Sequence, residues 1–273
     1  MTFYKPIQHD LRCGLLRAEY WLAVFVTSIS LLQYFRLLSL HNISGTLGDC
    51  LLYLFRGEQA ISSLSSGNQK TEIPILWILL IVTCPALHIR YFLDGLTMNG
   101  QQIMIRCQSR KHWILSKCVW AMAGGCLYYL MILICAVTSC IIMNQVLSLS
   151  MTASIAEDIL NTDTVSAKQV LFTTVVKPLI VFQTCNLLQI ALQMFIHPIA
   201  AFLICFVSIL FSLYSPIPWI PFAGAIAVRN IHIPMANIES WISIVSCFIA
   251  QLLCISISIW RFSSIDLLRR EDT

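Results

Sequence analysis

Long apolar runs dominate the chain and divide it into segments of helical length. A helix that crosses the hydrocarbon core of a bilayer needs about 20 mostly apolar residues. Runs of this kind occupy six ranges, at about 20–40, 74–92, 113–143, 171–196, 198–214 and 241–260. The third range is longer than a bilayer requires, so we expect that helix to tilt or to protrude. The pattern predicts an all-α polytopic membrane protein with six transmembrane helices in a single domain over 1–273.

The composition agrees with a membrane protein and excludes other classes. Of the 273 residues, 58% are hydrophobic and only 11% are charged, and the mean hydropathy is +0.79. A soluble domain carries about 25% charged residues, so this chain cannot cover a water-facing surface of its size. An ordinary soluble domain, a disordered protein and a disulfide-stapled secreted module are therefore excluded.

The 12 cysteines predict neither a disulfide framework nor a metal site. Most of them lie inside the apolar runs, where a free thiol behaves as a small hydrophobic side chain. Only Cys50 and, at the margin, Cys140 fall in an expected outer loop. No CxxC pair is present, which argues against a structural zinc site.

The basic residues predict the orientation of the six helices. Cytoplasmic loops carry an excess of Lys and Arg near the ends of the spans. Eleven of the 17 basic residues fall on one side: Lys5, Arg12, Arg17, Arg90, Arg106, Arg110, Lys111, Lys117, Arg261, Arg269 and Arg270. We therefore expect a multi-pass protein of the plasma membrane with both termini in the cytoplasm. No stripe of positive charge is dense enough for nucleic acid, which is not an expected partner.

The stretch before the first apolar run, 1–19, has the pattern of a helix that lies in the membrane interface. Ile7, Leu11, Leu15 and Ala18 share one helical face, and polar residues occupy much of the rest. We predict a short amphipathic helix at the inner surface. A frayed polar leader is the alternative.

The stretch 215–240 is apolar but is interrupted by prolines at 216, 218, 221 and 234. Proline lacks a backbone N–H donor, so a regular span cannot form there. Unpaired backbone groups at membrane depth must be sheltered by protein or by water. We predict a re-entrant pair of short helices on the outer side, with Trp219 near the interface, and a simple outer loop as the alternative. The other long connection, 41–73, is rich in glycine and serine, and we predict a polar loop with turns.

The segment 93–112 connects the second and third spans on the side that holds most basic residues. Asp-Gly and Asn-Gly dipeptides end the second span, and a short helix can form over 101–107. Ser109 is placed to cap the third span, and Trp113 is expected at the interface. The positive-inside rule alone accounts for the basic residues of this segment, so by themselves they indicate only topology.

No catalytic motif that we looked for is present. The sequence lacks HExxH, GxSxG and GxxxxGK[ST], and acidic residues are nearly absent from the spans. We expect that the chain is not an enzyme, that it binds no ATP by a P-loop of its own, and that any energy comes from a partner.

Four polar side chains of the fourth span are candidates for a substrate path: Lys177, Asn186, Gln189 and Gln193. Lys177 lies about one turn from the outer end. It either snorkels to the interface or faces a cavity, where it would meet an anionic group of a substrate. The other three are spaced three and four residues apart on one helical face. They suit hydrogen bonds between helices or, in an intramembrane enzyme, a convergent polar cluster.

Several of these features occur together in one known family. They are the interfacial helix, the proline-broken segment before the last span, the tail 261–266, and the 92–117 segment, which reads FLDG at 92–95, IR at 105–106 and SRK at 109–111. Together they resemble the permease subunit of type-2 ABC exporters, in the small Gram-positive subgroup often linked to peptide export or self-immunity.

The resemblance implies that 93–112 is a cytoplasmic coupling segment that docks on a separate ABC ATPase subunit. It assigns this contact to Gln101, Ile103, Met104, Arg106, Cys107, Arg110 and Lys111. It also implies two permease copies, as a homodimer, and two ATPases that bind ATP and Mg²⁺. Alternating access would then move an amphipathic peptide, antimicrobial or lipid-like substrate out of the cell, along a route lined by the second and fifth spans.

Two other functions stay open at the level of the sequence. One is an intramembrane enzyme, and the other is a non-catalytic membrane scaffold or immunity protein that needs no ATP. An ATPase subunit that copurifies with the chain would distinguish the exporter from both.

Overall fold

The structure is a computed structural model that describes residues 10–11, 20–40, 44–57, 74–94, 109–152, 165–215, 217, 219–231, 233–235 and 237–264. The prediction of an all-helical protein is confirmed for these residues, among which the only β pairing is an isolated bridge between Thr46 and Val146. The elements are α2 (Tyr20–Leu40), α3 (Leu47–Phe55), α4 (Ile75–Asp94), α6 (Arg110–Ile142), α8 (Ala167–Leu171), the π-helix η2 (Phe172–Val176), α9 (Lys177–Gln193), α10 (Pro198–Tyr214), the 3₁₀-helix η3 (Pro221–Ala225), α11 (Ala227–Asn230) and α12 (Ile238–Ser264).

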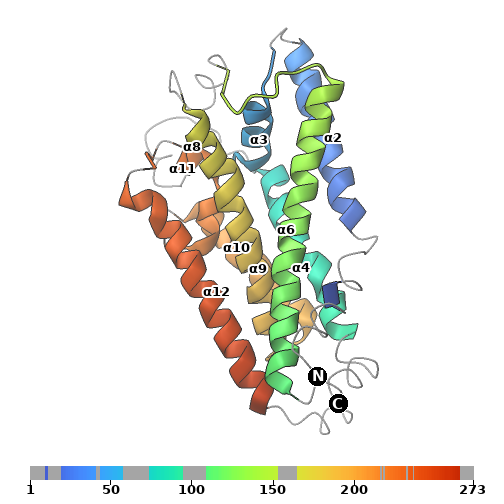
Figure 1. Ribbon diagram of the computed structural model, residues 1–273, viewed down its shortest axis with the longest axis vertical. Coiled ribbons are helices and arrows are strands. Elements are labelled where there is room, and N and C mark those ends of the chain that lie inside the picture. The colour runs from blue at the N-terminus through green and yellow to red at the C-terminus, as the bar shows by residue number, and fades with distance from the viewer. Residues whose placement is uncertain are drawn as a thin grey trace.

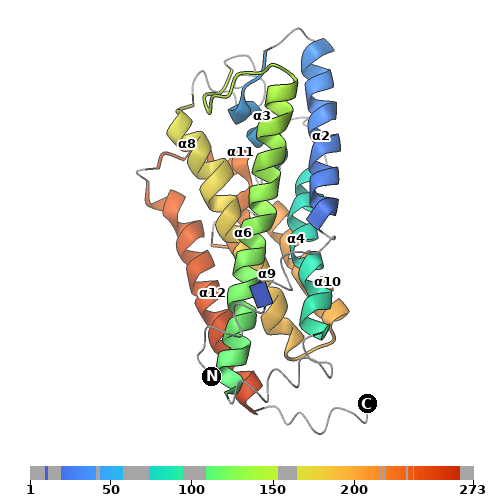
Figure 2. The same cartoon turned by 45° about the vertical axis from the view of Figure 1, so that its right-hand side comes forward.

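The long helices run roughly along the longest axis of the molecule and form an elongated bundle (Figures 1 and 2). The central helix is α9, which packs against α4, α6, α10 and α12 and buries 12 of its 17 residues. We call the end where α6 begins and α12 ends the basal end, and the opposite end, which carries α3, the α3 end (Figure 1). Most of α9 is therefore covered by other helices.

Large apolar side chains also cover much of the outer surface of the bundle. Phe211 of α10 is 63% exposed and Leu252 of α12 is 66% exposed. Three described helices are long and apolar enough to cross a membrane: Arg110–Ile142, Ala167–Gln193 and Ile238–Ser263, while Ile75–Ile89 and Pro198–Tyr214 are shorter apolar helices. These helices are compatible with a membrane protein, because apolar surface on this scale suits lipid rather than water.

The prediction of a polar loop over 41–73 is wrong at α3. Thr46 caps this helix, since its hydroxyl accepts from Asp49 N–H while the Asp49 carboxylate accepts from Thr46 N–H. Leu52 and Phe55 are completely buried in the main core, where each contributes about 1.5–3 kcal/mol by burial. Nine residues with one apolar face are thus folded back onto the bundle.

The start of α6 confirms one prediction and shows how a second predicted residue packs. Ser109 caps the helix as predicted, with its hydroxyl accepting from His112 N–H. Trp113, which was expected at the interface, packs inside the protein: it is 2% exposed and stacks on Phe262 of α12, with ring centroids 4.8 Å apart. This pair holds the start of α6 against the end of α12.

The proline-broken stretch before α12 folds as η3 and α11 rather than as a regular span. Ala225 and Ala227 are completely buried, and Trp77 Nε1 of α4 donates to Ala225 O at 3.0 Å. Trp219, by contrast, is 71% exposed. Within the described residues this stretch therefore packs into the bundle against α9 and α12, and side chains of those helices shelter its irregular backbone.

Candidate functional site

The basal end begins with exposed basic residues on α6. Arg110 and Lys111 are the two predicted coupling residues that the structure describes, and both side chains are exposed. The remaining five, Gln101, Ile103, Met104, Arg106 and Cys107, lie outside the described residues. Their role as a docking surface stays a prediction.

A buried ion pair lies within two turns of these exposed residues. Lys117 Nζ donates to Asp10 Oδ1 at 2.7 Å, and Ser116 Oγ donates to Asp10 Oδ2 at 2.5 Å. All three residues are buried. Both carboxylate oxygens are used, so Asp10 is held in one position against α6.

Aromatic contacts extend this ion pair to the last helix. Lys117 Nζ lies 5.3 Å from the centre of the Trp113 ring, whose other partner is Phe262. We call Asp10, Trp113, Ser116, Lys117 and Phe262 the basal joint. It connects the N-terminal segment, α6 and α12 at a single point, although only Asp10 and Leu11 of the predicted interfacial helix are described.

Lys177, the first candidate of the fourth span, points into the protein. Its side chain is 1% exposed, Nζ donates to Asn230 Oδ1 at 2.6 Å, and Nζ also lies 5.4 Å from the centre of the Phe172 ring. The interpretation that it snorkels to the interface is therefore wrong. Its amine is used within the chain, between α9 and α11.

Asn230 in turn organises the irregular backbone around it. Its Nδ2 donates toward the carbonyls of Ala223, Gly224 and Ile226, at 3.1, 3.3 and 2.7 Å. The guanidinium of the preceding residue, Arg229, donates to carbonyls at the C-terminal end of α10, those of Ser212, Leu213 and Ser215. These bonds satisfy backbone oxygens that a broken helix leaves open.

Asn186 connects three helices in the middle of the bundle. Its Nδ2 donates to Ala121 O of α6 at 3.1 Å, and its Oδ1 accepts from Cys84 Sγ of α4 at 3.3 Å. A Cβ atom at Gly125 would lie 3.0 Å from Nδ2, so the small residue permits this close approach. These contacts agree with hydrogen bonding between helices rather than with a free catalytic amide.

The two glutamines are less well satisfied. Gln189 Nε2 donates to Pro198 O at 3.3 Å, but among the described residues its Oε1 has no partner, and neither amide atom of Gln193 has one there. Both side chains are buried. The structure thus brings the four polar candidates onto the buried side of α9, but it does not join them into one cluster.

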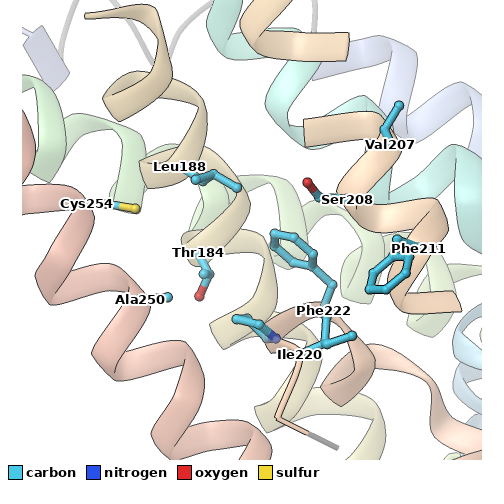
Figure 3. A pocket seen from close by; sticks show the side chains of 10 residues that line it. Thr184, Leu188, Val207, Ser208, Phe211, Ile220, Phe222, Ala250 and Cys254 are labelled. Carbon is cyan, nitrogen blue, oxygen red and sulfur yellow. The ribbon is translucent and has the colours of Figure 1, made fainter. Parts of the chain in front are cut away.

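A cavity of about 470 Å³ lies beside α9, between α10 and α12 (Figure 3). Its walls are formed by all three helices and by η3: Thr184, Leu188, Val207, Ser208, Phe211, Ile220, Pro221, Phe222, Ala250 and Cys254. The lining is mostly apolar, and the sequence analysis did not predict it. Small side chains at Ser208 and Ala250 were the available signal, but only the packing of four separate elements makes them neighbours.

Cys50 and Cys140 also come together, which the sequence alone did not predict. Their sulfurs are 3.5 Å apart, although the residues are 90 positions apart. The hydrogen bond with Cys140 and burial raise the pKa of the Cys50 thiol. No group of three or more His, Cys, Asp or Glu side chains that could hold a metal ion occurs among the residues that the structure describes.

No protein-family model, curated protein or solved structure matches the chain.

Proposed function

We propose that this chain is the permease subunit of an ATP-driven exporter in the plasma membrane. In this proposal all six predicted spans cross the membrane, and both termini and the basal end face the cytoplasm. An ABC ATPase partner, with ATP and Mg²⁺, docks on the segment that precedes α6. Two copies of the chain form a homodimer, and alternating access moves an amphipathic molecule outward.

The observation that carries the proposal is the basal joint. The exposed residues Arg110 and Lys111 begin the same helix in which Trp113, Ser116 and Lys117 are fixed to Asp10 and Phe262. A force applied at the first turn of α6 cannot be absorbed by local bending, because two other segments hold the next turns. The joint is what a partner at the basal end would need in order to move the bundle.

The length and contacts of α6 supply the next step. This helix has 33 residues, reaches from the basal end to the α3 end, and packs against α2, α9 and α12 (Figure 1). A tilt of α6 would move the central helix α9 with it, because Asn186 of α9 donates to a backbone carbonyl of α6. In the proposal this changes how α4 and α10 are spaced, the pair that would line the substrate route.

Affinity purification from native membranes tests the proposal. The tagged chain is expected to retain an ATPase with a P-loop, identified by mass spectrometry. Arg110→Glu combined with Lys111→Glu should release it, because reversed charge at the docking surface costs both attraction and on-rate. The matched control is Arg56→Glu with Lys168→Glu, two exposed basic residues outside the basal end, which should leave the partner bound.

Each other outcome counts against the proposal. If no ATPase is recovered in any detergent or in lipid discs, the exporter is excluded, and a scaffold or immunity protein becomes the better reading. If both charge-reversal variants release the partner equally, docking does not occur at the basal end.

A further inference from the structure

We propose that the cavity between α10 and α12 binds the hydrocarbon tail of an amphiphile that reaches it from within the membrane. The proposal rests on the membrane location of the chain, which is part of the proposed function, but it requires no ATPase. It also assigns a site different from the expected substrate route along α4 and α10.

The chemistry of the walls selects an apolar ligand. Thr184 Oγ1 donates to Ile180 O at 2.9 Å and accepts from Gln251 Nε2 at 3.0 Å. Ser208 Oγ donates to Ile204 O at 2.8 Å. The hydroxyl groups of the lining are thus already bonded within their own walls, and a polar ligand would lose its hydration with little to replace it. A hydrocarbon chain has no such cost.

The position of the cavity selects a ligand that arrives from lipid. Val207 and Phe211 line it and are also among the most exposed apolar side chains of α10. In Figure 3 they lie on α10, on the opposite side of the cavity from Ala250 and Cys254 of α12. The same surface that would contact lipid tails therefore forms part of the cavity wall.

Hydrogen bonds from two neighbouring helices anchor the η3 wall of the cavity. Pro221 and Phe222 of η3 belong to this wall, and Cys247 Sγ of α12 donates to Pro221 O at 3.1 Å. At the other end of η3, Trp77 Nε1 of α4 donates to Ala225 O. The volume of about 470 Å³ lies within the range of about 300–1,000 Å³ that is typical of small-ligand sites. A preformed site loses little free energy to ordering when it is occupied.

Photolabelling in lipid discs tests the site. The probe is a phosphatidylcholine with a diazirine in the middle of one acyl chain, and its adducts are mapped by peptide mass spectrometry. We expect adducts to concentrate on cavity residues such as Ser208, Phe222 and Cys254. Ala250→Phe, which places an aromatic ring in the cavity from the α12 side, should lower labelling there about tenfold. Leu252→Phe is the matched control on the lipid-facing side of α12 and should change it little.

A second arm distinguishes two sources of the same chemistry. If excess lauric acid displaces the phospholipid probe, the site takes single-chain amphiphiles; if it does not, the site takes the tails of bilayer lipids. Both results support a hydrocarbon site. Ser208→Leu narrows the cavity from the α10 side and should also reduce labelling, so a folding defect of Ala250→Phe alone cannot decide the outcome.

Three results would overturn the inference. One is labelling spread evenly over the exposed faces of α10 and α12, and another is labelling of the cavity that Ala250→Phe and Ser208→Leu leave unchanged. The third is a second copy of the chain that covers the cavity, seen as cross-links between the α10 helices together with loss of labelling. None of these results bears on whether an ATPase copurifies, so the two proposals fail separately.

Discussion

Lys177 and Asn230 form a buried hydrogen bond of 2.6 Å that joins the central helix α9 to the irregular segment α11. No carboxylate of the described residues forms an ion pair with Lys177. The amide oxygen of Asn230 therefore supplies the main polar contact of a side chain that is otherwise packed against Phe172. The pair fixes the broken stretch against the bundle, because the same asparagine holds three backbone carbonyls.

Removing either partner is expected to destabilise the protein unequally. Lys177→Met leaves Asn230 Oδ1 without its donor and should cost about 1–3 kcal/mol. Asn230→Leu removes the acceptor of a buried ammonium and the amide donor of three carbonyls, of which Ala223 O keeps the Ile226 N–H, and should cost about 3–5 kcal/mol. The midpoint of heat-induced unfolding in detergent measures both, with exposed Lys168→Met as a neutral control. A greater loss for Lys177→Met than for Asn230→Leu would contradict this account of the pair.

The basal joint predicts a strong coupling between Asp10 and Lys117. Asp10→Leu alone removes the carboxylate that pairs with the buried Lys117 ammonium and should cost about 3–5 kcal/mol. The double variant Asp10→Leu with Lys117→Met removes both charges and should recover most of that loss. Lys111→Met at the same end is exposed and should stay within about 0.5 kcal/mol of the wild type.

A double-mutant cycle on the unfolding midpoint provides the check. If the stability losses of Asp10→Leu and Lys117→Met, measured separately, simply add in the double variant, Asp10 and Lys117 do not act as a pair. The basal joint as described would then be wrong.

The Cys50 and Cys140 sulfurs predict a cross-link that oxidation can form. Their separation of 3.5 Å needs only small side-chain rotations to reach a bond of about 2.05 Å. Copper–phenanthroline with dioxygen should remove two electrons and two protons from the thiols and join them, faster at pH 9 than at pH 7, because the thiolate is the nucleophile. Peptide mass spectrometry without reduction detects the product, and Cys50→Ser or Cys140→Ser should abolish it. Failure to form it in the wild type would place α3 away from the end of α6.

Local signals of the sequence were sufficient for some elements of the fold. The bounds of α10 coincide with the predicted range 198–214, because Pro198 starts the helix and an uninterrupted apolar run follows. Ser109 was identified as a cap from its position before the third run, and the structure confirms it. Both are decided within a few residues of the chain.

Contacts between distant residues account for what the sequence did not reveal. Trp113 has basic neighbours that favour an interface, but its stacking partner lies on the last helix. Lys177 lies near enough to the end of its predicted span for its side chain to snorkel, yet its amine donates to Asn230, 53 residues away in the sequence. The cavity is formed by side chains of four separate elements. The short helix α3 buries its apolar face only by packing against the rest of the bundle. Neither hydrophobic periodicity nor composition encodes such pairings directly.

ATP hydrolysis by the complex purified through this chain is the decisive test of whether it is the permease of an ATP-driven exporter. The account predicts Mg²⁺-dependent hydrolysis that elutes with the wild-type chain in lipid discs, is lost with Arg110→Glu and Lys111→Glu, and persists with Arg56→Glu and Lys168→Glu. A chain that purifies intact from native membranes with no hydrolysis above that of an untagged control would contradict the claim that it is the permease of an ATP-driven exporter.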